Sequence, residues 1–311
     1  MNPINWLAHA DWSVHSSKRW ICIATITPND ITVDAPRMVE EVASPERLIT
    51  TLIDRHGATS RGVLGLDVCL GIPIAYAKVA GVDAFVPLLR QLGTPPWHQW
   101  FDVAETVEQI TVHRPFYPLK GGRKKMDDLV NALGLQSRDA LRRHCDYDPL
   151  TGKRWGAPLF WTMGAAQVGK ASLHAWEHVV QPALLSPDVC LWPHQHTQLH
   201  TAQVIITEAF PTAYYRALNL QAGSKRDPTA HVKHLPSLQT WSLEHRVHID
   251  PQIFELWHDA HMEEDAFDSL IGCLGMIDAW LHQRLNVHDD PLVRQVEGGI
   301  WGLPIGKKHK K

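Results

Sequence analysis

The chain has 311 residues, of which 44% are hydrophobic and 20% are charged, and its formal net charge is −3. This length and balance are typical of a globular protein with one large domain or two ordinary ones. The negative net charge excludes a protein that binds nucleic acid through its overall charge, so a nucleic-acid partner would have to be held by a local basic patch.

Cysteine and histidine usage gives no sign of a zinc ribbon. The five cysteines are widely spaced, with no CxxC pair, and this pattern does not predict a disulfide framework either. The 20 histidines are scattered, and we interpret His194, His196 and His200 as a polar loop. The chain starts without the basic and apolar regions of a signal peptide, and no apolar run is long enough to cross a bilayer. We therefore expect a cytoplasmic protein with no membrane partner, whereas the sequence does not indicate its oligomeric state.

The amino-terminal part predicts an antiparallel meander followed by a helix. Alternating apolar and polar residues favour strands over 5–12, 20–27 and 31–39, and Pro28–Asn29–Asp30 is a strong turn signal between the last two. Residues 44–56 predict a helix, with Ser44 as a cap, Pro45 in its first turn and Gly57 after its end.

The run 63–70 (VLGLDVCL) is typical of a central strand that is covered on both faces. Asp67 interrupts this run. A carboxylate in such a place costs several kcal/mol unless it is paired, exposed at the strand end or bound to a metal. Gly71 and Pro73 follow closely, so Asp67 is either a metal ligand or an acid that makes a turn at the strand end.

Residues 75–199 lack a strand-dominated pattern, and we expect them to form a mostly helical insertion. Helices are predicted over 75–92, 127–133 and 137–145. The densest internal basic patch lies within 120–125. Lys170 ends a glycine-rich segment that lacks the spacing of a phosphate-binding loop.

Residues 204–210 return to strand character, with Glu208 as the one acid, and 212–220, 251–258 and 262–281 predict helices. In the last helix Asp265 and Asp268 share a face, because they are three residues apart. Small residues continue the same face: Gly272, Gly275 and Ala279. By itself this helix reads as an amphipathic core helix with acids at its amino end, where the helix dipole favours them.

The order of elements and acids resembles the ribonuclease H-like fold. In the Holliday-junction resolvase branch of that superfamily, metal-binding acids lie on the first strand, on the fourth strand and three apart on the last helix. The same positions are occupied here by acids: Asp11, Asp67, Asp265 and Asp268. The chain also resembles an uncharacterised bacterial and archaeal family of predicted nucleases with this fold, over stretches that cover most of its length: 64–73, 159–170, 204–218, 265–273 and 297–304.

The resemblance implies an α/β fold, with a mixed sheet flanked by helices. The ribonuclease H-like core would comprise residues 1–74 and 200–306, the insertion residues 75–199, and a basic tail residues 307–311. The implied activity is that of a divalent-metal-dependent nuclease or phosphoester hydrolase. It would use Mg²⁺ or Mn²⁺, with one ion or two about 3.5–4 Å apart. The implied roles are metal ligands for Asp11, Asp67, Asp265 and Asp268, a ligand or water-orienting base for Glu208, and phosphate contacts for Lys170 and Lys233.

Two other functions fit the same fold. The first is a non-catalytic domain that binds nucleic acid or protein, which the net charge and weak basic patches favour. The second is a nucleotide-dependent phosphotransferase, but the paired glycine-rich loops of duplicated halves are missing from this sequence.

Overall fold

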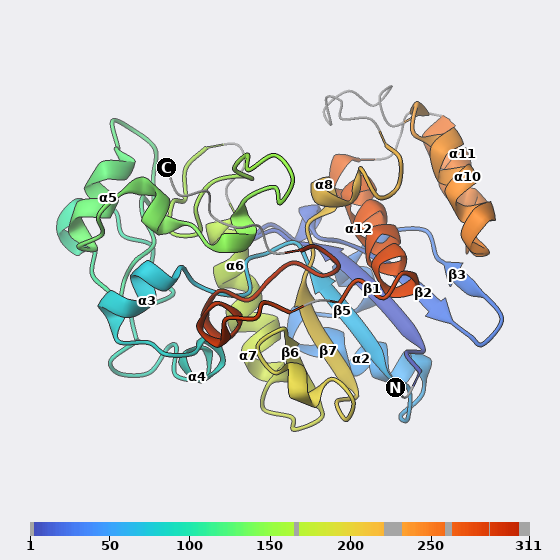
Figure 1. Ribbon diagram of the computed structural model, residues 1–311, viewed down its shortest axis with the longest axis horizontal. Helices are drawn as coiled ribbons and strands as arrows, with labels where there is room; N and C mark the ends of the chain where they lie inside the picture. Colours follow the sequence, from blue (N-terminus) through green and yellow to red (C-terminus); the bar gives the residue numbers. More distant parts are fainter. Residues whose placement is uncertain (1–2, 165–167, 221–231, 259–262, 286, 305–311) are drawn as a thin grey trace.

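The computed structural model describes residues 3–164, 168–220, 232–258, 263–285 and 287–304. They form an eight-stranded mixed sheet with helices on both faces (Figure 1). The strand order is β6-β7-β5-β1-β2-β3-β8, and β4 pairs with β2. The strands are β1 (Trp6–Asp11), β2 (Trp20–Ile26), β3 (Ile31–Val33), β4 (Arg37–Met38), β5 (Gly62–Leu66), β6 (Val189–Trp192), β7 (Val204–Glu208) and β8 (Val247–Ile249).

Strand directions follow the expected plan at the centre of the sheet. The strands β1, β2 and β3 form the antiparallel meander, and β5 and β7 run parallel to β1. The expected third strand is divided into β3 and β4, with Pro36, which has no backbone N–H, in the gap between them. The carboxyl ends of β1, β5 and β7 therefore meet at one edge of the sheet.

The helices divide between the two faces of the sheet (Figure 1). One face carries α2 (Leu48–His56) and α6 (Gly169–Ala175), with a π-helical turn, Trp176–Val180, after it. The other face carries α8 (Pro211–Tyr214), α10 (Leu235–His245), α11 (Pro251–His258) and α12 (Glu264–Leu281). The remaining helices are α1 (Val39–Val42), α3 (Ile74–Ala80), α4 (Phe85–Leu89), α5 (Met126–Ala132) and α7 (Gln181–Ala183).

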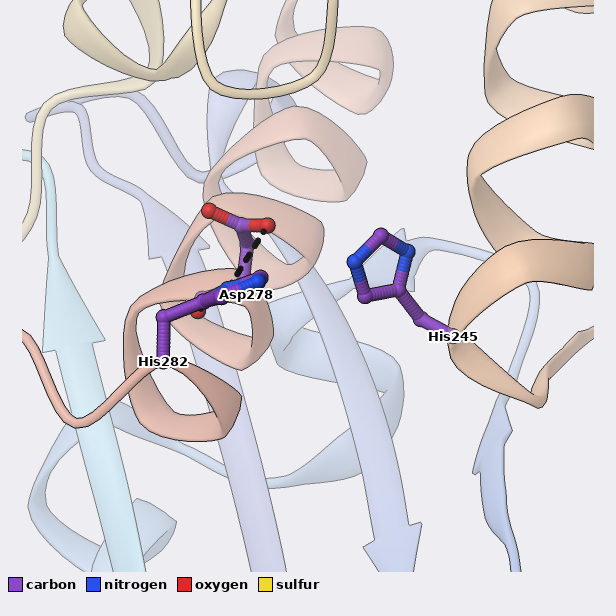
Figure 2. Close-up of side chains that lie close together, drawn as sticks. All are labelled: His245, Asp278 and His282. Atoms are coloured by element: carbon purple, nitrogen blue, oxygen red, sulfur yellow. Dashed lines mark hydrogen bonds and ion pairs between the residues drawn. The ribbon is translucent and has the colours of Figure 1, made fainter.

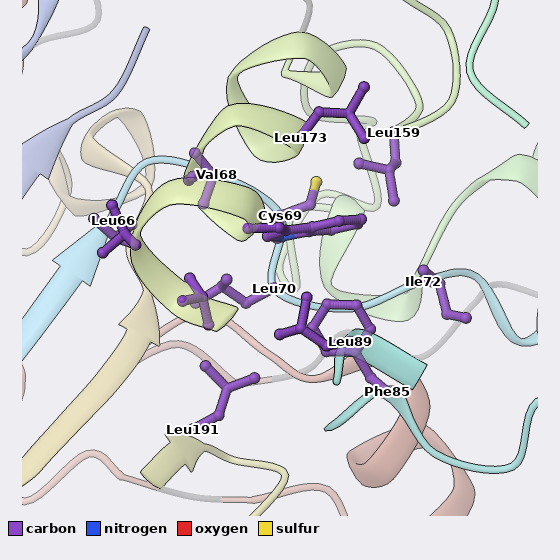
Figure 3. Packing of buried hydrophobic residues seen from close by; sticks show 14 of the residues in the cluster. Leu66, Val68, Cys69, Leu70, Ile72, Phe85, Leu89, Leu159, Leu173 and Leu191 are labelled. Atoms are coloured by element: carbon purple, nitrogen blue, oxygen red, sulfur yellow. The ribbon is translucent and has the colours of Figure 1, made fainter. Parts of the chain in front are cut away.

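A separate hydrophobic core lies on each face of the sheet, because successive side chains of a strand point to opposite faces. Trp6, Ala8 and Ala10 of β1 belong to the core under α2 and α6, whereas Leu7 belongs to the core under α12. Figure 3 shows how the segment after β5 continues into the first core, where Val68 and other buried side chains pack together.

Two glycines let α12 lie very close to its neighbours, as the stripe of small residues predicts. A Cβ atom on Gly272 would lie 2.1 Å from Nδ1 of His9 on β1, and one on Gly275 would lie 2.1 Å from Cγ of Tyr214 on α8. Any larger residue at either position would overlap a ring, so both contacts require glycine. The predicted helix 262–281 is thus present as α12 from Glu264 to Leu281, packed directly on the centre of the sheet, while residue 262 lies outside the described residues.

The segment 75–199 differs from the mostly helical insertion that we expected. It contains short helices joined by long connections, and Gly81 ends α3 in a left-handed conformation with φ of 67°. Its strand β6 pairs with β7 and is an integral part of the sheet, so the sheet resumes before residue 200. The basic tail 307–311 lies outside the described residues. No helix in the described part of the chain is long and apolar enough to cross a membrane.

Candidate functional site

Asp11 and Asp67 lie side by side at the carboxyl ends of two neighbouring parallel strands. Ala10 of β1 pairs with Leu66 of β5, and the N–H of Asp67 donates to the carbonyl of Ala10 at 3.0 Å. The residues on either side of each aspartate belong to the core on the face opposite α12: Ala10 and Trp12 flank Asp11, and Leu66 and Val68 flank Asp67. By alternation, Asp11 and Asp67 therefore lie on the face that α12 covers.

The amino end of α12 lies over the same edge of the sheet. The Nδ1–H of His9 donates to the carbonyl of Ser269 at 3.1 Å, and Lys18, just after β1, lies close enough to lower the pKa of Asp265. The helix therefore runs antiparallel to β1. Gly272 packs on the His9 ring. From this contact, Asp11 is two residues, or about 6.6 Å, further along the strand, and Asp268 is four residues, or about 6 Å, back along the helix. This geometry brings Asp268 level with Asp11.

The two helix acids differ in environment. Asp268 is 9% exposed, while Asp265 is half-buried. Burial raises the pKa of Asp265, and the nearby Glu264 and Asp268 raise it further, whereas Lys18 opposes the change. A carboxyl group whose pKa is raised by burial and by other acids is typical of sites that bind a cation or a proton.

The aspartates are near one another without forming a closed ligand cluster. Within the described residues, Asp11, Asp67, Asp265 and Asp268 do not belong to any group of three whose ligand atoms all lie within 4.8 Å of one another. The arrangement offers hard oxygen donors, which Mg²⁺ and Mn²⁺ prefer.

Glu208 does not join these aspartates, and this corrects our expectation for it. Its strand neighbour Ile206 packs in the core opposite α12, so the side chain of Glu208 also points to that face. There Arg143 binds it in a fork, with Nη1 at 2.6 Å from Oε2 and Nη2 at 2.7 Å from Oε1. The N–H of Leu70 also donates to Oε2 at 2.7 Å. Glu208 is therefore a buried ion-pair partner, away from the face that α12 covers.

The two candidate phosphate-binding lysines lie near this edge of the sheet on different faces. Lys170 is one turn before His174 of α6, and His174 accepts a hydrogen bond from Trp12 Nε1 at 3.3 Å. The Nζ of Lys170 donates to the carbonyl of Leu119 at 3.3 Å. Lys233 is exposed and precedes His234, whose ring stacks on Phe267 of α12 with centroids 6.0 Å apart. Lys233 is thus the one of the two that lies on the face of the aspartates.

His9 is a residue of this site that sequence reasoning did not single out. It is fully buried between β1 and α12, and burial lowers its pKa to about 4, although its backbone hydrogen bonds oppose this. The ring is therefore neutral at physiological pH. A buried strand histidine has no distinctive spacing, and only the packing of Gly272 against its ring reveals it.

We expect His9 to make stability fall with acid. The unfolded chain takes up a proton below pH about 6.5, and the folded chain does so only below about 4. The unfolded state binds more protons between these values, so the free energy of unfolding should fall as the pH drops from about 6.5 to about 4, by about 3 kcal/mol from this residue. Urea denaturation across this range should show a shallower loss for His9→Gln than for the wild type.

A matched control is His248→Gln, because His248 is exposed on β8. This control should keep the wild-type pH dependence. Parallel curves for the wild type and His9→Gln would show that His9 does not remain neutral in the folded protein.

Three other histidines differ from the sequence interpretation. His194 was expected in a polar loop but is buried, and its two ring nitrogens lie 2.9 and 2.7 Å from the carbonyl oxygens of Gln295 and Leu70. His245 and His282 were not singled out from sequence, yet they meet Asp278 at the carboxyl ends of α10 and α12 (Figure 2). His245 and His282 are 37 positions apart, so no local sequence pattern predicts that they lie close together.

Comparison with known proteins identifies no family for this chain. No family model and no solved structure matches it. The enolase of Beutenbergia cavernae is 42% identical to it over 65 residues. This stretch is 21% of the present chain and 15% of that enolase, so the similarity is local to both proteins. It transfers neither a fold nor an activity.

Proposed function

We propose that this protein is a divalent-metal-dependent nuclease or phosphoester hydrolase with a ribonuclease H-like fold. Asp11, Asp67, Asp265 and Asp268 would be the metal ligands, with Mg²⁺ or Mn²⁺ as the ion. The observation that carries the proposal is the pairing of β1 with β5, which sets Asp11 beside Asp67 under the amino end of α12. Three separate elements thus bring acids to one edge of the sheet.

The strand order supports the proposed fold. An antiparallel meander is followed by strands parallel to its first strand, and α12 lies across β1 and β2. The acids occupy the end of the first strand, the end of the strand parallel to it and the first turns of the last long helix. This arrangement agrees with the positions that the resemblance implies for Asp11, Asp67, Asp265 and Asp268.

The chemistry of the site supports the proposed reaction. Divalent ions bound there would activate water and stabilise the attacking and leaving oxygens of a phosphodiester. The chain's own residues would position those ions: Asp11 and Asp67 are held by the sheet, and Asp268 by the close packing of Gly272 on His9. Lys233 lies on the same face and would contribute positive charge toward a phosphate backbone.

The first test is the effect of Mg²⁺ and Mn²⁺ on the melting temperature. An ion at about 100 times its Kd stabilises the folded state by about 2.7 kcal/mol. For a protein of this size that corresponds to a rise of about 5 °C. We expect this rise in the wild type and its loss in the Asp265→Asn/Asp268→Asn variant.

Asp54→Asn is the matched control, since Asp54 is exposed on α2 at the opposite face of the sheet. It should keep the full shift in melting temperature. The absence of a shift in the wild type would refute the metal site. A shift without cleavage of any nucleic-acid substrate would instead favour a non-catalytic binding domain.

A further inference from the structure

A second group of metal-ligating side chains lies at the far end of α12 from the aspartates. His245 ends α10, Asp278 lies in the last turn of α12, and His282 follows that helix. One nitrogen or carboxylate oxygen from each residue lies within 4.8 Å of the other two. In Figure 2 the His245 ring reaches from α10 toward Asp278 and His282.

Backbone hydrogen bonds orient the two imidazoles in the same way. Nδ1 of His245 lies 2.8 Å from the carbonyl of Trp241, and Nδ1 of His282 lies 2.8 Å from the carbonyl of Asp278. A carbonyl oxygen only accepts, so each Nδ1 must carry the proton that it donates. The neutral form of each ring then has its lone pair on Nε2. Metal-binding histidines are typically held by a backbone carbonyl in this manner.

The carboxylate of Asp278 is held in place by two donors. It is 2% exposed, Nε1 of Trp241 donates to its Oδ1 at 3.1 Å, and Arg284 forms an ion pair with its Oδ2. Nδ1 of His282 also lies 3.4 Å from Oδ1. A carboxylate has about four acceptor positions, so these three contacts still leave one for a metal ion. Arg284 has a double role here, because it orients the carboxylate and its charge also opposes a cation.

We propose that His245, Asp278 and His282 bind a Zn²⁺ ion. Two imidazole nitrogens and one carboxylate oxygen suit Zn²⁺ rather than Mg²⁺, which prefers oxygen ligands. Bonds of about 2.0–2.1 Å in a tetrahedral site place ligand atoms about 3.3 Å apart. The present separations of up to 4.8 Å therefore need a small closure. His282 is the residue that supplies it, since its side chain is 48% exposed.

The surroundings of the group allow an ion to enter and add negative charge. A cleft of about 490 Å³ opens on it, and Glu244 and Asn219 also line this cleft. Glu244 offsets the positive charge of Arg284. Three protein ligands leave one position of a tetrahedral ion open to water from this cleft.

The test is a Zn²⁺ titration of the full chain, after removal of bound metal, against a chromogenic chelator. We expect one Zn²⁺ per chain at this site, and an affinity at least about tenfold weaker in His245→Gln and in His282→Gln. Neither side chain is buried, so both variants should fold, which their melting curves will check. The control is His248→Gln. His248 lies 3.1 Å from one acid, Asp30, so this variant should bind Zn²⁺ like the wild type.

The Asp265→Asn/Asp268→Asn variant separates this site from the proposed hydrolase site. It leaves His245, Asp278 and His282 intact, so the Zn²⁺ affinity lost in the glutamine variants should persist in it. Absence of Zn²⁺ binding in the wild type would overturn the proposal. Equal affinity in the wild type and both glutamine variants would do so too, and would leave the two histidines as capping groups of their helices.

Discussion

Replacing Asp67 with asparagine should lower the rate of Mn²⁺-dependent phosphodiester hydrolysis at least about 100-fold. Asparagine keeps the size of the side chain but lacks the negative charge that the proposed metal site requires. Asp67 is also half-buried beside Asp11 and follows a fully buried strand, so the sheet fixes its position. The measurement is kcat/KM on single-stranded, duplex, hybrid and branched nucleic acids.

The control for this experiment is again Asp54→Asn, whose rate should equal that of the wild type. Melting curves will establish that Asp67→Asn remains folded. A folded Asp67→Asn variant with wild-type activity would remove Asp67 from the site. Activity that persists in excess chelator would remove the metal ion from the reaction.

The second large effect is expected at Arg143. Its side chain is 1% exposed and binds Glu208 through two short hydrogen bonds, with a further ion pair to Asp146 at 2.9 Å. Burial raises the pKa of Glu208, and Arg143 lowers it. Arg143→Met would leave a buried carboxylate without its partner, so we expect the free energy of unfolding to fall by about 3–5 kcal/mol. Urea denaturation measures this change.

The matched control is Arg154→Met. Arg154 pairs with Asp139 at 2.5 Å, but both side chains are about half exposed, so the loss should be at most about 1 kcal/mol. The double variant Arg143→Met/Glu208→Gln should recover part of the loss, because it removes the stranded charge. Equal effects for Arg143→Met and Arg154→Met would contradict the structural role of this ion pair.

The Glu208 result also bears on metal binding. If Glu208 is a structural acid, Glu208→Gln should keep the shift of melting temperature with Mg²⁺ that the Asp265→Asn/Asp268→Asn variant loses. Alternation along β7 fixes the face to which Glu208 points, but its binding partner could not be predicted from sequence. That partner is Arg143, which is 65 residues away, between two short 3-10 turns that replace the helix predicted over 137–145.

The features that local pattern determines were predictable. The meander, the central strand before Asp67 and the helix 262–281 all have strong periodicity and clear end signals, and each is present. The stripe Gly272–Gly275 also correctly predicted a close approach of that helix. These features depend on side-chain spacing within one element, which the sequence displays directly.

Features that depend on partners distant in sequence were missed. The strand β6 has four residues and pairs only with β7, and β8 has three residues and pairs with β3. Segments this short carry too few alternating residues to be recognised. The group of His245, Asp278 and His282 was missed for the same reason, because it joins the ends of two helices.

A crystal structure with Mn²⁺ tests most directly whether Asp11, Asp67 and the aspartates of α12 hold divalent ions. We predict an anomalous peak about 2.2 Å from carboxylate oxygens of Asp11 and Asp67, with Asp268 or Asp265 of α12 drawn toward it. The same peak should be absent from crystals of Asp67→Asn. Well-ordered wild-type crystals with no peak between β1, β5 and α12 at saturating Mn²⁺ would contradict the proposed metal site.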